Sequence, residues 1–168
     1  YMGGAKAVAA VAGCLAHERI EVEDAAVVAV EWANGAFGTI LGTTAAWPGF
    51  AKRIEISGTD GTAVMDEASV LKTWAFRKET ARDAAIRQRF AAGGQGTGAS
   101  DPMAFTPENH RRQLVDFVRA LRRGGQPLVD GREGRKSVEI ILAAYKAAAT
   151  GRRVELPLAA TYRPGRGR

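Results

Sequence analysis

The sequence has little of several residue types, and each shortage excludes a class of protein. Among its 168 residues it has a single cysteine, Cys14, and one thiol cannot form an internal disulfide. The only two histidines, His17 and His110, cannot build a structural zinc site with Cys14 alone. No run approaches the ~20 apolar residues that a membrane-spanning helix needs. We therefore expect no metal site and no membrane association, and we place the protein in the cytoplasm.

Acidic residues are also in the minority, since the formal net charge is +6. The surplus of basic residues lies in the segments 77–94 and 159–168, which do not read as a folded basic face. A helical segment carries five arginines, but it lacks the interleaved aromatic side chains on which nucleic-acid bases stack. These arginines are Arg111, Arg112, Arg119, Arg122 and Arg123. We therefore predict a solvated helix face and no nucleic-acid partner.

The first half of the chain reads as a series of short strands separated by turn residues. The expected strands are 5–13, 26–33, 37–46, 53–57, 62–66 and 69–76. Asn34 and Gly35 predict a two-residue hairpin turn between the second and third strands, because both residues tolerate positive φ. Sequential short strands joined by tight turns predict antiparallel pairing.

The second half reads as helices. A short helix is expected over 80–90, a second from the cap Thr106 to the pair Gly124-Gly125, and a third from Asp130 to Gly151. The last two helices each carry an apolar stripe, which we expect to cover the sheet. These stripes are Leu114, Phe117, Val118 and Leu121, and Val138, Ile141, Leu142 and Tyr145. A short edge strand is expected at 154–156.

These elements predict an α+β fold of two layers, with an open, mainly antiparallel sheet and helices packed on one face. We expect this domain to span residues 1–158, with 78–105 as a flexible loop or lid and 159–168 as a disordered basic tail. Trp32, Val30 and Val28 share one side of their strand, and Val27 and Ala29 share the other with Glu31. A sheet that is apolar on both faces implies a partner, for which a second copy of the chain is the simplest candidate.

Several motifs follow one another in a specific order along the chain. They are Glu21 to Val27, Trp32 to Ile40 with its Asn-Gly turn, Ile54 to Thr62, His110 to Gln113 with Phe117, and Leu128 to Arg135 continuing through Tyr145 to Pro157. In this order they resemble the C-terminal domain of the glucose-fructose oxidoreductase/inositol dehydrogenase/rhizopine catabolism (Gfo/Idh/MocA) oxidoreductase superfamily. The resemblance covers nearly all of residues 5–158.

The resemblance implies two domains with different roles. In that family an N-terminal Rossmann domain binds NAD or NADP, and the C-terminal domain completes the substrate pocket and makes oligomer contacts. The present chain shows neither a dinucleotide fingerprint nor the Glu-Lys-Pro segment that carries the family's catalytic lysine. The N-terminal Rossmann domain is thus absent from this chain. We expect the fragment alone to be inactive, to bind no cofactor and to hold no catalytic residue.

Four residues are candidates for binding a sugar or polyol substrate. Trp47 and Phe50 flank a Pro-Gly turn that faces the interdomain cleft in relatives, and aromatic walls suit the apolar faces of a sugar. His110 lies near a helix start, where it can bond a substrate hydroxyl, and Arg111 can bind a carboxylate or phosphate. Ordinary packing or solvated side chains are the alternatives. The second functional hypothesis is an interaction module that binds an acidic partner through its sheet face and basic tail.

Overall fold

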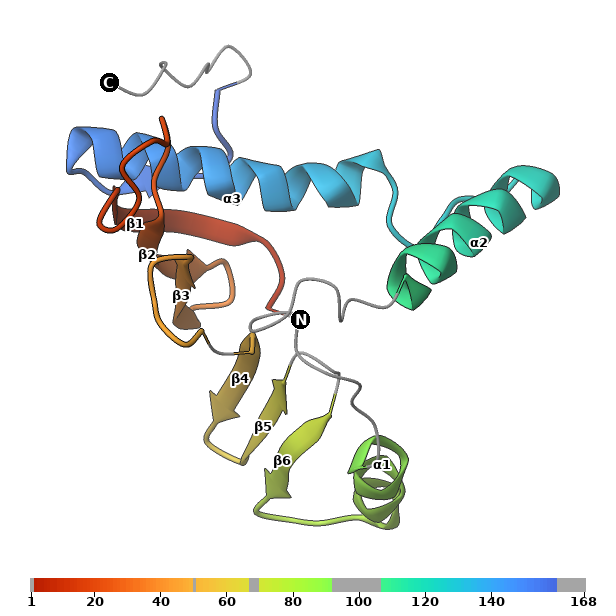
Figure 1. Ribbon diagram of the computed structural model, residues 1–168. Helices are drawn as coiled ribbons and strands as arrows, with labels where there is room; N and C mark the ends of the chain where they lie inside the picture. Colours follow the sequence, from red (N-terminus) through yellow and green to blue (C-terminus); the bar gives the residue numbers. More distant parts are fainter. Residues whose placement is uncertain (1, 50, 67–69, 92–106, 160–168) are drawn as a thin grey trace. The chain divides into compact units, whose positions relative to one another are not determined.

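The computed structural model describes residues 2–49, 51–66, 70–91 and 107–159. The chain divides into two compact units, one formed by Tyr1–Ala46 with Gln113–Arg168 and the other by Trp47–Arg112. Each unit contains its own antiparallel sheet, and neither sheet is closed. The predicted α+β class with open antiparallel sheets is therefore confirmed, although the strands form two sheets (Figure 1).

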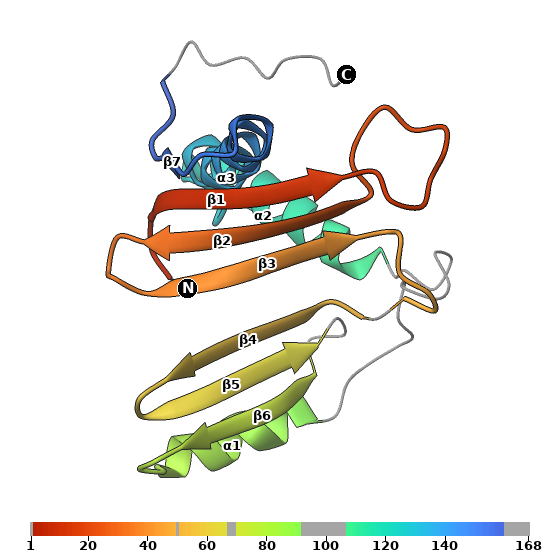
Figure 2. The same cartoon turned by 90° about the vertical axis from the view of Figure 1, so that its left-hand side faces the viewer.

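The first unit holds a four-stranded sheet in the order β3-β2-β1-β7 (Figure 2). Its strands are β1 Ala5–Gly13, β2 Ala25–Trp32, β3 Phe37–Thr43 and β7 Val154–Glu155. The short strand β7 pairs with β1 at the edge of the sheet, as the sequence predicted. This pairing brings the end of the described chain back beside its first strand.

The hairpin between β2 and β3 differs from the predicted two-residue turn. Four residues, 33–36, separate the two strands; Glu31 pairs with Phe37 in the ladder, and the Trp32 N–H donates to the Ala36 carbonyl at 2.8 Å. The Gly35 N–H donates to the Trp32 carbonyl, and Gly35 takes positive φ, at 87°. The Asn34 side chain accepts a hydrogen bond from the Ala36 N–H at 3.0 Å.

The core of the first unit lies between the sheet and helix α3, Gly131–Thr150. Asp130 caps its first turn by accepting the Glu133 N–H at 2.8 Å, and Gly151 ends the helix at φ 63°. Both caps were predicted from the sequence. The helix lies along one face of the sheet (Figure 1), where it buries Ala143 and Ala147. These alanines pack against four valines, which are Val8, Val28, Val30 and Val154.

The prediction of which helix face covers the sheet was wrong. Of the stripe expected to pack there, Val138, Ile141 and Tyr145 are exposed. The alanine face packs instead, because small side chains let a helix approach a flat sheet closely. Helix α2, Glu108–Arg123, also leaves its whole apolar stripe exposed, and Gly124 ends it at φ 63° as predicted.

The second unit holds a three-stranded sheet in the order β4-β5-β6, formed by Arg53–Gly58, Gly61–Asp66 and Leu71–Phe76. Helix α1, Ala81–Ala91, packs on β6 and confirms the predicted short helix. The Trp74 indole donates to Asp83 at 2.8 Å, which joins the helix to the strand. Of the segment expected to be a loop or lid, 78–91 thus contains a helix, whereas 92–105 lies outside the described residues, as does nearly all of the predicted tail.

The alanine face of α3 makes a specific prediction about stability. Ala143→Leu inserts three carbons into a packed contact, so it is expected to lower the free energy of unfolding by about 1–3 kcal/mol. Ala149→Leu is the matched control, because Ala149 is exposed on the last turn of the same helix. Urea unfolding followed by circular dichroism measures both variants. An equal decrease in the free energy of unfolding for both variants would show that Ala143 does not lie in a packed contact with the sheet.

Candidate functional site

The face of the first sheet that points away from α3 is apolar and open. In the register of the ladder, Val11 lies opposite Val27, which lies opposite Leu41, so these three side chains form one row across β1, β2 and β3. Val11 is 76% exposed and Leu41 is 72% exposed. Ala9 and Ala29 form the next row, and Phe37 is exposed beyond them. The sequence predicted this second apolar face from the alternation along β2.

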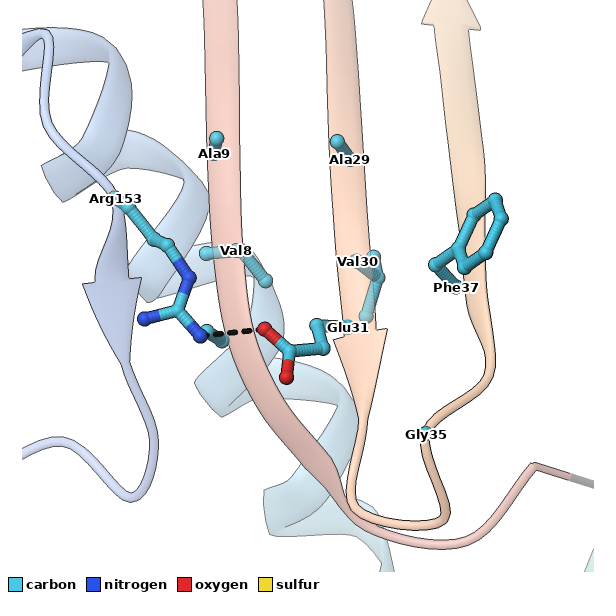
Figure 3. A pocket seen from close by; sticks show the side chains of 9 residues that line it. Val8, Ala9, Ala29, Val30, Glu31, Gly35, Phe37 and Arg153 are labelled. Carbon is cyan, nitrogen blue, oxygen red and sulfur yellow. Dashed lines mark hydrogen bonds and ion pairs between the residues drawn. The ribbon is translucent and has the colours of Figure 1, made fainter.

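A shallow hollow of about 410 Å³ lies at the hairpin end of this open face. Figure 3 shows Ala9 and Ala29 at its floor, with Phe37 on one side and Arg153 reaching across β1 toward Glu31 from the other. The floor is low because its side chains are single methyl groups. The hollow can therefore receive a projecting apolar side chain from a partner surface.

Four charged side chains form a cluster beside this hollow. The Lys6 ammonium donates to Glu31 Oε1 at 2.6 Å, and the Arg153 guanidinium bridges Glu31 and Glu155, with 2.9 Å to the latter. The hydrogen bond from Lys6, followed by that from Arg153, holds the pKa of Glu31 below its ordinary value. The pKa of Arg153 is raised, first by the bond to Glu31 and then by that to Glu155. Two cations and two anions leave the cluster with no net charge.

A buried carboxylate holds the long connection between β1 and β2. Asp24 Oδ1 accepts the Leu15 N–H at 2.7 Å, and Oδ2 accepts the N–H groups of Ala16 at 2.8 Å and His17 at 2.9 Å. The His17 ring adds a contact from Nδ1 at 3.0 Å. The Ala16 N–H above all holds the pKa of Asp24 well below its ordinary value, and the other donors outweigh the opposing effect of burial. Sequence reasoning missed this clamp; its one signal was an aspartate placed directly before a strand.

The predicted substrate-binding residues fall in the second unit, Trp47–Arg112, without forming a joint site among its described residues. Trp47 is 93% exposed and precedes a cis peptide bond to Pro48, and Phe50 lies outside the described residues. His110 is exposed in the first turn of α2. No hydrogen bond or ion pair within the described ranges joins Trp47 to His110.

Arg111 already has a partner on its own helix. Its Nε and Nη2 donate to the two oxygens of Glu108 at 2.7 and 2.9 Å, and Arg112 donates to the same carboxylate. These bonds, led by the one from Arg111, lower the pKa of Glu108 to about 2. An incoming carboxylate or phosphate has to compete with Glu108 for the Arg111 guanidinium. The pair thus holds Arg111 in a set position on the first turn.

The described residues fit neither a metal ion nor a dinucleotide. No group of three or more His, Cys, Asp and Glu side chains in them is arranged to hold a metal. A Rossmann site needs a parallel βαβ unit, whereas every strand pair in the described part of the chain is antiparallel. No helix there is long and apolar enough to cross a membrane.

Comparison with known proteins identifies relatives of both the sequence and the fold. A family model described as the oxidoreductase family, C-terminal alpha/beta domain, matches residues 2–156. The WlbA dehydrogenases from Bordetella pertussis and Chromobacterium violaceum, each solved with NADH and UDP-GlcNAcA, are 29% and 30% identical, with a TM-score of 0.75 for both. A levoglucosan dehydrogenase solved with NADH and levoglucosan shares the fold at 24% identity and a TM-score of 0.68. No curated protein sequence matches.

The chain spans less than half the length of these structures. It is covered over 94% of its own length in both WlbA matches but accounts for 43% and 42% of the WlbA chains. For levoglucosan dehydrogenase the two figures are 93% and 46%. The similarity is therefore to one part of each enzyme.

The Asp24 clamp predicts how the loop responds to mutation and to acid. In Asp24→Asn, amide exchange at residues 15–17 is expected to become at least about tenfold faster at neutral pH, because the amide NH₂ faces N–H donors. A lowered pKa contributes stability above the ordinary carboxylate pKa that is lost as pH falls through the folded-state value. The wild-type loop should therefore stay protected until well below the usual range of aspartate.

Hydrogen-exchange NMR at a series of pH values measures this loop directly. Glu18→Gln, on an exposed side chain of the same loop, removes the same charge and should leave exchange unchanged. Equal exchange in Asp24→Asn and Glu18→Gln would show that the buried carboxylate does not order the loop.

Proposed function

Because this chain belongs to the Gfo/Idh/MocA oxidoreductase family as its C-terminal alpha/beta domain, we propose that it is the substrate-binding and oligomerisation domain of an NAD(P)-dependent oxidoreductase. The substrate class is a sugar, a polyol or a related small molecule that bears a hydroxyl group. The match over residues 2–156 carries the proposal. It is supported by the two WlbA dehydrogenases, whose complexes hold NADH and UDP-GlcNAcA.

Within this class we favour an anionic, nucleotide-linked sugar. Both relatives that are about 30% identical are solved with such a ligand. Arg111 can bind a carboxylate or phosphate bidentately once the ligand displaces the Glu108 carboxylate, which occupies its Nε and Nη2. Trp47 offers an exposed aromatic surface for the apolar face of a sugar ring, and Phe50 follows it three positions later in the sequence. His110 offers a ring nitrogen to a substrate hydroxyl.

The chain's residues bind and orient the substrate in this proposal, and the hydride chemistry belongs to another part of the enzyme. NAD(P) accepts or donates the hydride when it is bound. The antiparallel strands described here do not fit that cofactor. We therefore propose that the chain alone is inactive and that the catalytic residues lie in the part of the enzyme that binds the dinucleotide. The single free cysteine suits the cytoplasm.

The open face of the β1–β2–β3 sheet is the proposed oligomer contact. An interface between identical copies brings a surface against itself, so any net charge on that surface repels. The chain has a net charge of +6, whereas the cluster of Lys6, Glu31, Arg153 and Glu155 on this face is neutral. A neutral apolar face therefore suits a second copy. It offers an acidic partner no attraction, which leaves the alternative of an acid-binding module without support from the sheet.

Substrate binding is tested in the full-length oxidoreductase with Arg111→Lys and His110→Gln. Each variant is expected to raise KM for a nucleotide-linked sugar acid by about tenfold, because it removes a bidentate or directional contact, and to leave the NADH Kd unchanged. Arg132→Lys on an exposed position of α3 is the control. The isolated chain should leave NADH fluorescence unchanged. Tight NADH binding by this chain, or an unchanged KM in both variants, would contradict the proposal.

The oligomer contact is tested with Leu41→Asp, which places a charge in the apolar row of the open face. Light scattering after size-exclusion chromatography should show the wild-type chain as an oligomer and Leu41→Asp as a monomer. Leu15→Asp is the matched control, because Leu15 is similarly exposed, at 78%, but lies in the connection after β1. A monomeric wild-type chain, or dissociation by both variants, would remove the open face from the interface.

A further inference from the structure

Helix α2 carries a second uncovered apolar surface, which the proposed function leaves unassigned. Leu114 is 65% exposed, Leu121 is 66% exposed, and Phe117 and Val118 lie between them at helical spacing. We call these four residues the α2 stripe. A single 16-residue helix is marginal in water unless an apolar face is packed. The stripe therefore requires a cover.

The first unit, to which the four stripe residues belong, does not supply that cover. Helix α3 turns its alanine face to the sheet and leaves Val138 and Ile141 exposed as well. Among the other described helices and strands of the first unit, none makes an extensive contact with α2. The segment after α2 folds back on the helix, because Asp116 accepts the Leu128 N–H at 2.7 Å and Gly125 donates to the Ala120 carbonyl. The stripe is thus exposed on a helix whose C-terminal turn is held by the segment that follows it.

The charged side chains beside the stripe indicate that its partner differs from the partner of the open sheet face. Arg111, Val118 and Arg122 follow one line along the helix, at spacings of seven and four residues, so the stripe is edged by arginine. Glu108 is engaged by Arg111 and Arg112, and Arg119, Arg122 and Arg123 make no ion pair within the described residues. Two copies of this surface would bring like charges together. A second copy suits the neutral sheet face and does not suit α2.

We propose that the α2 stripe docks the dinucleotide-binding half of the oxidoreductase, through an apolar surface rimmed with acidic residues. This inference rests on the proposed function. The occupant follows from length as well as charge, since the chain accounts for 43% of a WlbA dehydrogenase solved with NADH, and the remaining part of such an enzyme must meet this domain. His110 lies on the same helix face as Leu114, Phe117 and Leu121, at spacings of four, three and four residues. Docking of the stripe therefore places His110, a proposed substrate contact, at the boundary between this domain and the dinucleotide-binding half.

The test compares oxidative footprinting of the 168-residue chain with that of the full-length oxidoreductase. Phe117 and Leu121 are expected to be protected several-fold in the longer protein and accessible in the shorter one. Equal accessibility in both would overturn the proposal. This readout requires no turnover, so it distinguishes a failure of docking from a failure of the proposed function, which would appear as full-length protein that neither binds NADH nor oxidises a sugar.

A variant with two substitutions links docking to catalysis. Leu114→Ser with Leu121→Ser is expected to lower kcat/KM for the sugar by about tenfold to a hundredfold, because misplacement of the two halves misorients the substrate, while the NADH Kd stays unchanged. Leu15→Ser is the matched control on an equally exposed leucine. An unchanged kcat/KM in the double variant would overturn the proposal.

A cationic amphipathic helix can also bind an anionic membrane, and the same variant tests that occupant. Vesicles of phosphatidylglycerol and phosphatidylcholine are sedimented with the 168-residue chain. No co-sedimentation is expected for a stripe that meets a protein surface. Binding that Leu114→Ser with Leu121→Ser abolishes would assign the stripe to a lipid surface and overturn the proposal.

Discussion

The first sheet is apolar on both faces, and this constraint determines what the domain needs from its surroundings. Residues alternate along β2, so Val28 and Val30 enter the core beneath α3 while Val27 and Ala29 point to the opposite side. One helix can cover one face only. Because an uncovered apolar face costs free energy in water, the same strand that builds the core also produces the face that we propose as the oligomer contact.

The charged side chains beside the two uncovered surfaces differ, so the kind of partner that suits each surface differs as well. The open sheet face carries a cluster in which Lys6 and Arg153 are balanced by Glu31 and Glu155. The α2 stripe is bordered by arginines, and both acidic residues of the helix are engaged: Glu108 by Arg111 and Arg112, and Asp116 by the Leu128 N–H. Burial of apolar area stabilises a contact with any apolar partner surface. The charged side chains at the border favour a partner whose charges are complementary. In our proposals, the neutral sheet face therefore takes the symmetric contact and the arginine-edged α2 stripe takes the asymmetric one.

Sequence reasoning succeeded where structure is local and failed where it depends on packing. The strand β1, the Asp130 cap and the Gly151 end were predicted because turn and cap chemistry act within a few residues. The packed face of α3 was not, because its large apolar residues gave the stronger periodic signal although its alanines make the contact. The Asp24 clamp was also missed, since its donors become convergent only once the loop has folded. The family resemblance rested on the order of motifs and was confirmed.

The alanine-rich composition follows from how the domain distributes its side chains. Small residues occupy the interior, where Ala143 and Ala147 let α3 approach the valines of the sheet. Large apolar residues lie outside, on the open sheet face and along α2, as Leu41, Phe117 and Leu121 show. A domain that folds and acts alone places its largest apolar side chains inside. The reversed arrangement leaves large apolar side chains exposed, so the proposed contacts would add the hydrophobic stabilisation that folding of this chain alone does not provide.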